Sequence, residues 1–219
     1  MKFFSYESKF SQTLLKIANC CLLNLLWFVC SLPIFTMGAA TTALYYVTLK
    51  MVRDEEGAVV SQFFRAFREN FRQATVLWLI LLAAGALLAG DSYILFHLFR
   101  TTTGPVAVLW TLLFALVIAA SIAYAIVLAY VFPLVASVEN TNRAMLINAL
   151  FMGIRYLFCT ILIFAIHFAM FFVVVRLFTP AIVLGQGLCA LLSSYLLSGV
   201  IRACSYVPDR EGMEQGEEP

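Results

Sequence analysis

The sequence predicts an all-α protein, a polytopic bundle of transmembrane helices with about six spans. The chain of 219 residues is 63% hydrophobic and only 12% charged, with a mean hydropathy of +0.95. In soluble domains about a quarter of the residues are charged. The few charged residues divide the chain into long uncharged runs, and proline and glycine interrupt these runs where helices should end. The composition is therefore that of a protein whose solvent is the bilayer.

The first uncharged run, between Lys16 and Lys50, encloses 33 residues. One helix needs roughly 20 residues to cross the hydrocarbon core, so this run is long enough for two. Pro33 lies at its midpoint and disfavours helix for the residue before it, and Gly38 allows a turn or a close approach. We therefore expect a tight helical hairpin with structural breaks at Pro33 and Gly38.

The remaining runs complete the expected topology. Pro133 marks where the long fourth helix should stop. We expect one transmembrane domain over residues 1–206, with spans at about 12–32, 36–52, 73–99, 105–132, 156–176 and 179–203. If the first hairpin is re-entrant, the number of spans is five. Residues 207–219 are acidic and have no apolar periodicity, so they predict a disordered tail.

The basic residues predict the orientation of the spans. All 14 lysines and arginines except Arg100 and Arg176 fall in segments that six spans place on one side of the membrane. Cytoplasmic segments carry an excess of basic residues, so both termini should be cytoplasmic. No small-residue cleavage pattern follows the N-terminal lysines before Pro33, and we expect the N-terminus to be retained.

An amphipathic helix is expected at about 58–72, in the cytoplasmic interface. Phe63, Phe64, Phe67 and Phe71 recur at helical spacing, and Arg68 falls off that stripe. Such a helix can simply lead into the next span, can sense anionic lipids, or can dock a partner protein. We treat these five residues as a candidate partner face.

Polar residues inside the apolar runs are the other candidates. Asn24, Thr36, Asp91, His167 and Gln186 could line a polar pathway, or could hydrogen-bond between helices. Asp91 lies near the outer end of its run, where a carboxylate can reach water or pair with an arginine further along. His167 lies at the middle of the fifth expected span, where a neutral imidazole could bond a neighbouring helix.

Several classes of protein lack support. The sequence contains no nucleotide-binding glycine loop, no H-E-x-x-H motif and no G-x-S-x-G motif, and its six cysteines form no C-x-x-C pair. We therefore expect no catalytic residue, cofactor or metal ligand. The net charge of +2 is too small to favour nucleic acid as a partner. A non-enzymatic binding protein and a small transporter remain, and the oligomeric state is open.

The first hundred residues resemble the YesL-type bacterial integral membrane proteins, a family of unknown function. The residues that carry the resemblance are Asn24, Trp27, Leu32, Pro33, Ile34, Thr36, Gly38, Ala39 to Ala43, Leu44, Tyr45, Arg53, Glu55, Phe63, Phe64, Phe67, Asn70, Phe71 and Trp78. Beyond Gly104 only the hydropathy and Pro133 resemble the family.

This resemblance implies a multi-pass protein of the bacterial cell membrane. Such proteins are typically encoded beside components of carbohydrate ABC transporters, which implies an accessory role in carbohydrate or oligosaccharide import. Besides the lipid bilayer, the expected partners are therefore ABC transporter permease subunits. The family has no established catalytic residues to carry over. The transporter alternative would place a polar site near the broken helices.

Overall fold

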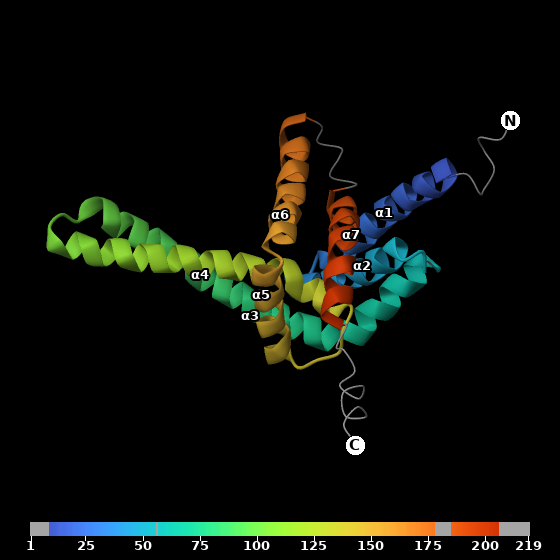
Figure 1. Ribbon diagram of the computed structural model, residues 1–219, viewed down its shortest axis with the longest axis horizontal. Coiled ribbons are helices and arrows are strands. Elements are labelled where there is room, and N and C mark those ends of the chain that lie inside the picture. Colours follow the sequence, from blue (N-terminus) through green and yellow to red (C-terminus); the bar gives the residue numbers. More distant parts are fainter. Residues whose placement is uncertain (1–8, 56, 178–184, 206–219) are drawn as a thin grey trace, which may run out of the picture.

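The computed structural model describes residues 9–55, 57–177 and 185–205, and these residues form helices and connecting turns without any strand (Figure 1). The expected acidic tail at 207–219 lies outside the described residues. The elements are α1 (Lys9–Ser31), the 3₁₀ turn η1 (Ile34–Thr36), α2 (Met37–Val52), α3 (Val59–Thr101), α4 (Pro105–Val135), α5 (Asn142–Arg155), α6 (Leu157–Phe172), the π-helical η2 (Val173–Leu177) and α7 (Gly185–Ser205).

The first two helices form a hairpin whose turn contains Pro33. Helix α1 ends at Ser31, Pro33 is extended, and α2 begins after the short turn η1. The Thr36 hydroxyl lies within hydrogen-bonding distance of two carbonyl oxygens of this turn, those of Cys30 at 2.6 Å and Pro33 at 2.7 Å. It thereby supplies a donor where the helical hydrogen bonds are interrupted. The break expected at Pro33 lies in this turn.

Side-chain contacts join the two arms of the hairpin along their length. Near the open end, the Lys16 ammonium group pairs with the Asp54 carboxylate at 2.8 Å. Near the turn, the Trp27 indole N–H donates to the Thr41 hydroxyl at 3.0 Å. These bonds hold α1 against α2 from the turn to the loop that follows α2.

At Gly38, α2 lies so close to α3 that no space remains for a side chain. A Cβ at this position would lie 2.5 Å from the Ala74 carbonyl oxygen and 2.6 Å from the Trp78 Cβ. Only a residue without a side chain fits such an approach between helices. Gly38 lies just inside α2, so it serves the packing of the second helix while the turn itself is made by the residues before it.

Helix α3 continues without interruption from Val59 to Thr101. The expected interfacial helix at 58–72 and the third span at 73–99 are therefore parts of one helix, and the boundary expected between them is not a structural break. The physical reason is that a stripe of covered residues continues through this boundary at three- and four-residue steps, from the buried Ala66 through the half-buried Asn70 to the buried Ala74, Leu77 and Leu81. One continuous stripe packs against α2 and needs no turn.

Helix α4 also departs from its expected end. It passes through Pro133 and finishes at Val135, so Pro133 does not break it. Pro133 has no N–H to donate to the Ala129 carbonyl oxygen, so the helix loses one hydrogen bond there. The neighbouring residues Phe132, Leu134 and Val135 are buried, and their packing keeps the chain helical past the proline. The Ser137 hydroxyl donates to the Pro133 carbonyl oxygen at 2.8 Å and satisfies one of the terminal acceptors.

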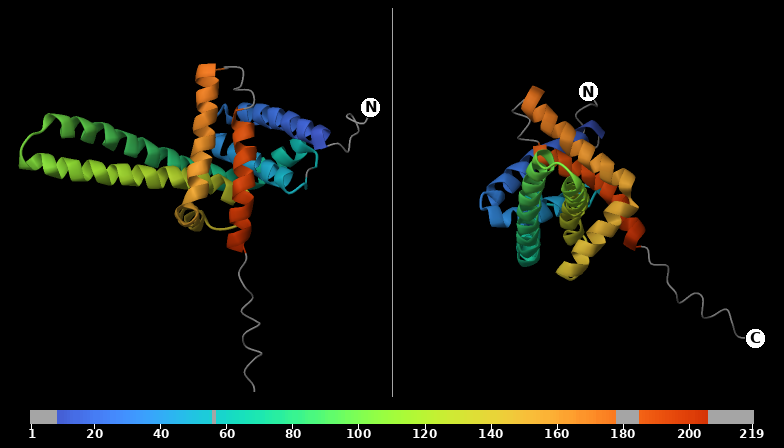
Figure 2. Two further views of the ribbon diagram at one scale, coloured as in Figure 1. Left: turned by 45° about the horizontal axis from the view of Figure 1, so that its top comes forward. Right: turned by 90° about the vertical axis from the view of Figure 1, so that its left-hand side faces the viewer.

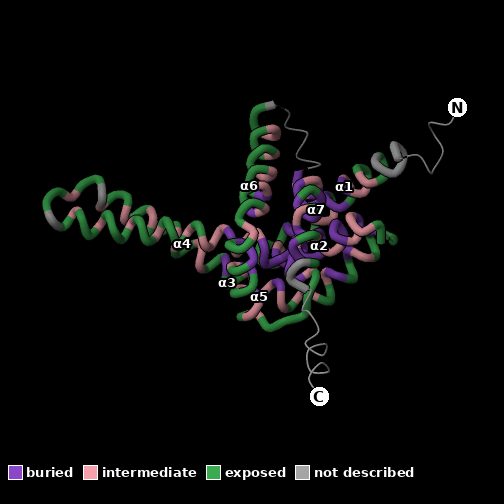
Figure 3. Tube along the Cα trace, in the orientation of Figure 1, coloured by how far each residue is buried: buried purple, intermediate pink, exposed green. Residues whose placement is uncertain are grey.

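The buried core lies where α2 meets α1, α3, α4 and α7, while the outer parts of α3 and α4 are mostly exposed (Figure 3). The hairpin of α3 and α4 extends away from this core, and α6 and α7 run across its direction (Figures 1 and 2). Contacts to α7 include a hydrogen bond of 2.9 Å between the buried Thr48 and Ser194 hydroxyls. The short helix α2 is thus the interior of the fold.

Four helices contain stretches that are long and apolar enough to cross a membrane. These stretches are Leu14–Ser31, Val59–Leu98, Val106–Val135 and Leu157–Arg176. Helix α2 has only 16 residues, fewer than the roughly 20 that a span needs. Several long apolar helices make this a membrane-embedded helical protein, and the number of six spans stays a prediction.

Replacing Gly38 with alanine tests the close approach of α2 to α3. The added Cβ meets a backbone oxygen and the Cβ of Trp78, so we expect the free energy of unfolding to fall by about 1–3 kcal/mol. The measurement is the thermal unfolding midpoint of the detergent-solubilised protein. Gly90→Ala is the matched control, because nothing lies within 4 Å of its Cβ position and alanine favours a helix. Equal midpoints for the two variants would contradict the packing.

Candidate functional site

In the structure, part of the expected partner face on α3 is buried and part is exposed. Phe63 is fully buried, and Phe67 and Phe71 are half-buried against the core. The Phe63 and Phe67 rings stack with their centroids 6.4 Å apart. Phe63 is therefore not accessible to a partner, which corrects its place in the candidate face. The helical spacing identified the apolar stripe, but α3 uses most of this stripe to cover α2.

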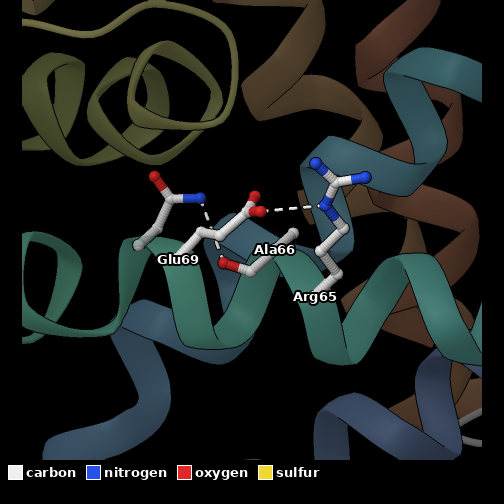
Figure 4. Close-up of polar contacts among 4 residues, drawn as sticks. Arg65, Ala66 and Glu69 are labelled. Carbon is white, nitrogen blue, oxygen red and sulfur yellow. Dashed lines mark hydrogen bonds and ion pairs between the residues drawn. The ribbon is translucent and has the colours of Figure 1, made fainter.

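The outer side of the same segment remains accessible. Phe64 is 40% exposed and Arg68 is exposed beside it. Together with Ser61, Arg65 and Glu69 they line a shallow depression on α3. The Arg65 Nε donates to Glu69 Oε1 at 2.8 Å, one helical turn away (Figure 4). Both side chains of this ion pair are well exposed, so the pair contributes little to stability and is free to exchange partners.

Asn24 has a specific structural role. Its side-chain oxygen accepts hydrogen bonds from the backbone N–H groups of Gln186 and Gly187, both at 3.1 Å. These groups belong to the first turn of α7, where backbone donors lack partners within the helix. Asn24 thus caps α7 from another helix. A Cβ on Gly187 would lie 2.5 Å from the Cys20 carbonyl oxygen, so the glycine allows α7 to approach α1 this closely.

Thr36 and Asp91 lie apart from the other polar candidates. Thr36 is engaged by the carbonyl groups of the first turn, as described above. Asp91 is exposed on the outer part of the α3–α4 hairpin and forms no ion pair with Arg100 within the described part of the chain. Arg100 instead lies over the Phe96 ring, 5.6 Å from its centroid. The His167 Nδ1 lies 2.9 Å from the Ile163 carbonyl oxygen, one turn back on the same helix.

A cavity of about 340 Å³ lies between α1, α2, α3, α4, α6 and the start of α7. Of the candidate pathway residues, it is lined by His167 and Gln186. Its aromatic lining residues are Trp27, Tyr45, Trp78, Phe132, Phe164 and His167. Asn24 contacts the backbone of Gln186 and so holds one corner of the cavity, whereas Thr36 and Asp91 lie elsewhere.

The polar atoms of the cavity's tryptophans are engaged in the protein. The Trp27 N–H donates to the Thr41 hydroxyl, which lies 2.8 Å from the Met37 carbonyl oxygen and donates to it. The Trp78 N–H donates to the Ile34 carbonyl oxygen at 2.7 Å. The indoles therefore offer ring carbon to the cavity, and its lining is predominantly apolar. This cavity could not be predicted from the sequence, because its aromatic residues come from distant segments and each has the local pattern of a packing residue.

No group of three or more His, Cys, Asp or Glu side chains that could hold a metal ion occurs among the described residues. The geometry offers two features to a ligand or partner, namely the exposed side of α3 around Phe64 and the apolar cavity. The described residues form an all-helical protein with several long apolar helices.

Residues 20–92 match the family model described as a protein of unknown function, DUF624. This is the family to which the YesL-type proteins belong, so the resemblance is confirmed for that part of the chain. The matched segment contains most of α1, all of α2 and most of α3. The comparison with curated proteins and the comparison with solved structures each found no match.

Replacing Asn24 with alanine tests the cap on α7. Two backbone N–H groups would lose their acceptor, so we expect the free energy of unfolding to fall by about 1–2 kcal/mol. Thermal unfolding of the solubilised protein measures the change. Asn19→Ala is the control, since Asn19 is half-buried on the same helix. If both variants unfold at the midpoint of the wild type, the Asn24 cap does not stabilise the protein.

Proposed function

We propose that the protein is a non-enzymatic accessory subunit of carbohydrate or oligosaccharide ABC import in the bacterial cell membrane, with both termini cytoplasmic. The family resemblance is the reason to propose a carbohydrate import system, and its permease subunits, as partners. The observation that supports a binding role in particular is the outward side of α3, where Phe64 and Arg68 stay exposed although the neighbouring stripe is buried.

The contact surface proposed here is smaller than the sequence suggests. It consists of Ser61, Phe64, Arg65, Arg68 and Glu69, which line the depression on α3. An exposed aromatic ring beside arginines is a combination enriched at protein interfaces. The Arg65–Glu69 pair can reorganise on contact, and the Arg68 guanidinium can meet a carboxylate of a permease.

The alternative function is a small transporter. His167 and Gln186 favour it, because both line the same cavity. Two observations weigh against it, since Thr36 and Asp91 do not reach that cavity and its lining is largely apolar. A sugar moving through such a cavity would leave most of its hydroxyl groups without partners, which is costly in an apolar environment.

The test is a pull-down of the tagged protein from its native membrane in mild detergent, with mass spectrometry of the recovered proteins. We expect ABC permease subunits in stoichiometric amount, and we expect the double variant Phe64→Ser, Arg68→Ser to lose them. Arg68 is exposed, but the Phe64 ring lies edge-on to the buried Phe63 ring with the centroids 5.7 Å apart, so we expect a small decrease of the unfolding midpoint and measure it alongside the pull-down.

Phe151→Ser is the matched control, because Phe151 is a similarly exposed phenylalanine on α5, away from the proposed surface. It should retain the permease subunits. Recovery of the protein alone would overturn the accessory role. Equal recovery with the double variant would overturn only the α3 surface as the contact.

A further inference from the structure

We propose that the cavity between α1, α2, α3, α4, α6 and the start of α7 binds one acyl chain of a membrane phospholipid, with the ester carbonyl group beside Gln186. This site is separate from the α3 surface assigned to a partner protein. It rests on the size of the cavity, on the chemistry of its lining and on the position of its mouth.

The size suits a hydrocarbon segment. The cavity has a volume of about 340 Å³. An apolar cavity of about 150 Å³ stays dry and binds benzene. The space here is about twice as large and admits a folded or extended run of methylene groups. Left empty, it would deprive its lining of dispersion contacts that a hydrocarbon would supply.

The lining selects an uncharged, mainly apolar occupant. Neither tryptophan offers its N–H, because Trp27 donates to Thr41 and Trp78 donates to Ile34. Thr41 is engaged in turn, accepting from Trp27 and donating to Met37. The cavity therefore presents ring faces and aliphatic groups, which favour a hydrocarbon over a hydroxyl-rich molecule.

Two polar side chains of the lining, His167 and Gln186, have groups that could meet a polar atom of an occupant. The His167 Nδ1 lies 2.9 Å from a carbonyl oxygen, which can only accept, so Nδ1 carries the hydrogen and Nε2 of the neutral ring is an acceptor. Gln186 adds an amide N–H₂ group that can donate to an ester oxygen. A phospholipid acyl chain carries one hydrogen-bonding group, its ester, followed by hydrocarbon. The ester can accept from the Gln186 amide while the hydrocarbon meets the apolar lining.

The mouth of the cavity points to the bilayer as the source. Phe164 lines the cavity and is also 40% exposed. It belongs to α6, within the stretch Leu157–Arg176 that is long and apolar enough to cross a membrane. A chain entering beside Phe164 would therefore come from surrounding lipid and need not pass through water.

The experiment uses tryptophan fluorescence, because two of the three tryptophans line the cavity. The variant Trp110→Phe leaves only Trp27 and Trp78. The full-length variant, delipidated in detergent, is titrated with phosphatidylcholine brominated near the middle of its acyl chains. We expect quenching that saturates at one lipid per protein. Quenching that is absent, or that rises without saturation, would overturn the proposal.

Filling the cavity supplies the specific control. Ala129 lines the cavity on α4, and Ala129→Phe in the Trp110→Phe background should abolish the saturable quenching. Ala120→Phe places the same ring at an exposed position of the same helix and should leave it unchanged. If Ala129→Phe does not fold, Ala125→Phe replaces it, since Ala125 also lines the cavity. Saturable quenching that survives in a folded cavity-filled variant would contradict the site.

A second lipid distinguishes the chain from the headgroup. None of the lining residues carries a fixed charge, so brominated phosphatidylglycerol should bind with the same stoichiometry and affinity as phosphatidylcholine. Binding of phosphatidylglycerol alone would show that an anionic headgroup is recognised elsewhere, and would overturn the acyl-chain assignment. Native mass spectrometry of the wild type should likewise show one retained phospholipid.

Discussion

The hydrogen bonds from the start of α7 to Asn24 hold the first and last described helices together. In a bilayer a polar group finds no water, so each one must be satisfied by the protein. Asn24 meets this constraint for itself and for the first turn of α7 at once. The position of α7 then depends on α1, and the cavity and the core beside α2 depend on both. A single polar side chain in an apolar run thus fixes an arrangement between segments far apart in the sequence.

The same constraint accounts for several other polar residues of the core. Thr36 replaces donors missing from the first turn, and Thr48 bonds Ser194 between α2 and α7. Tyr130 and Thr160 bond each other at 2.9 Å between α4 and α6. Such bonds stabilise helix contacts where apolar surface alone gives no preference for protein over lipid. The polar residues therefore serve the fold, which weighs against a shared polar pathway.

Local features of the fold could be predicted from the sequence, because their causes are local. Proline at position 33 restricts its own backbone and that of its neighbour, so the turn of the first hairpin follows from a few residues. The apolar character of the long runs is likewise a property of composition. The end of α4 was expected at Pro133 and lies at Val135, because the proline removes one hydrogen bond while the burial of its neighbours, which the sequence does not show, keeps the chain helical.

The candidate sites depended on tertiary contacts, and the sequence could not supply them. The periodicity placed Phe63 on an apolar stripe, but only the position of α2 shows that this stripe is covered. Asn24 was recognisable as a polar residue in an apolar run, while its partners lie on α7, far along the chain. The cavity needs six helices at once, and Trp27 and Trp78 come together only through the hairpin and the packing at Gly38.

The central claim is that the polar residues of the apolar helices hold the fold together and line no aqueous path. Thiol accessibility tests this claim most directly. Single cysteines at positions 36, 167 and 186, in a background lacking the six natural cysteines, are treated in inverted membrane vesicles, whose outer surface is the cytoplasmic face, with a charged, membrane-impermeant thiol reagent. A cysteine at the exposed position 64 is the positive control. We expect labelling at position 64 alone. Labelling at positions 36, 167 and 186 would show a water-filled pathway and contradict a purely structural role of these polar residues.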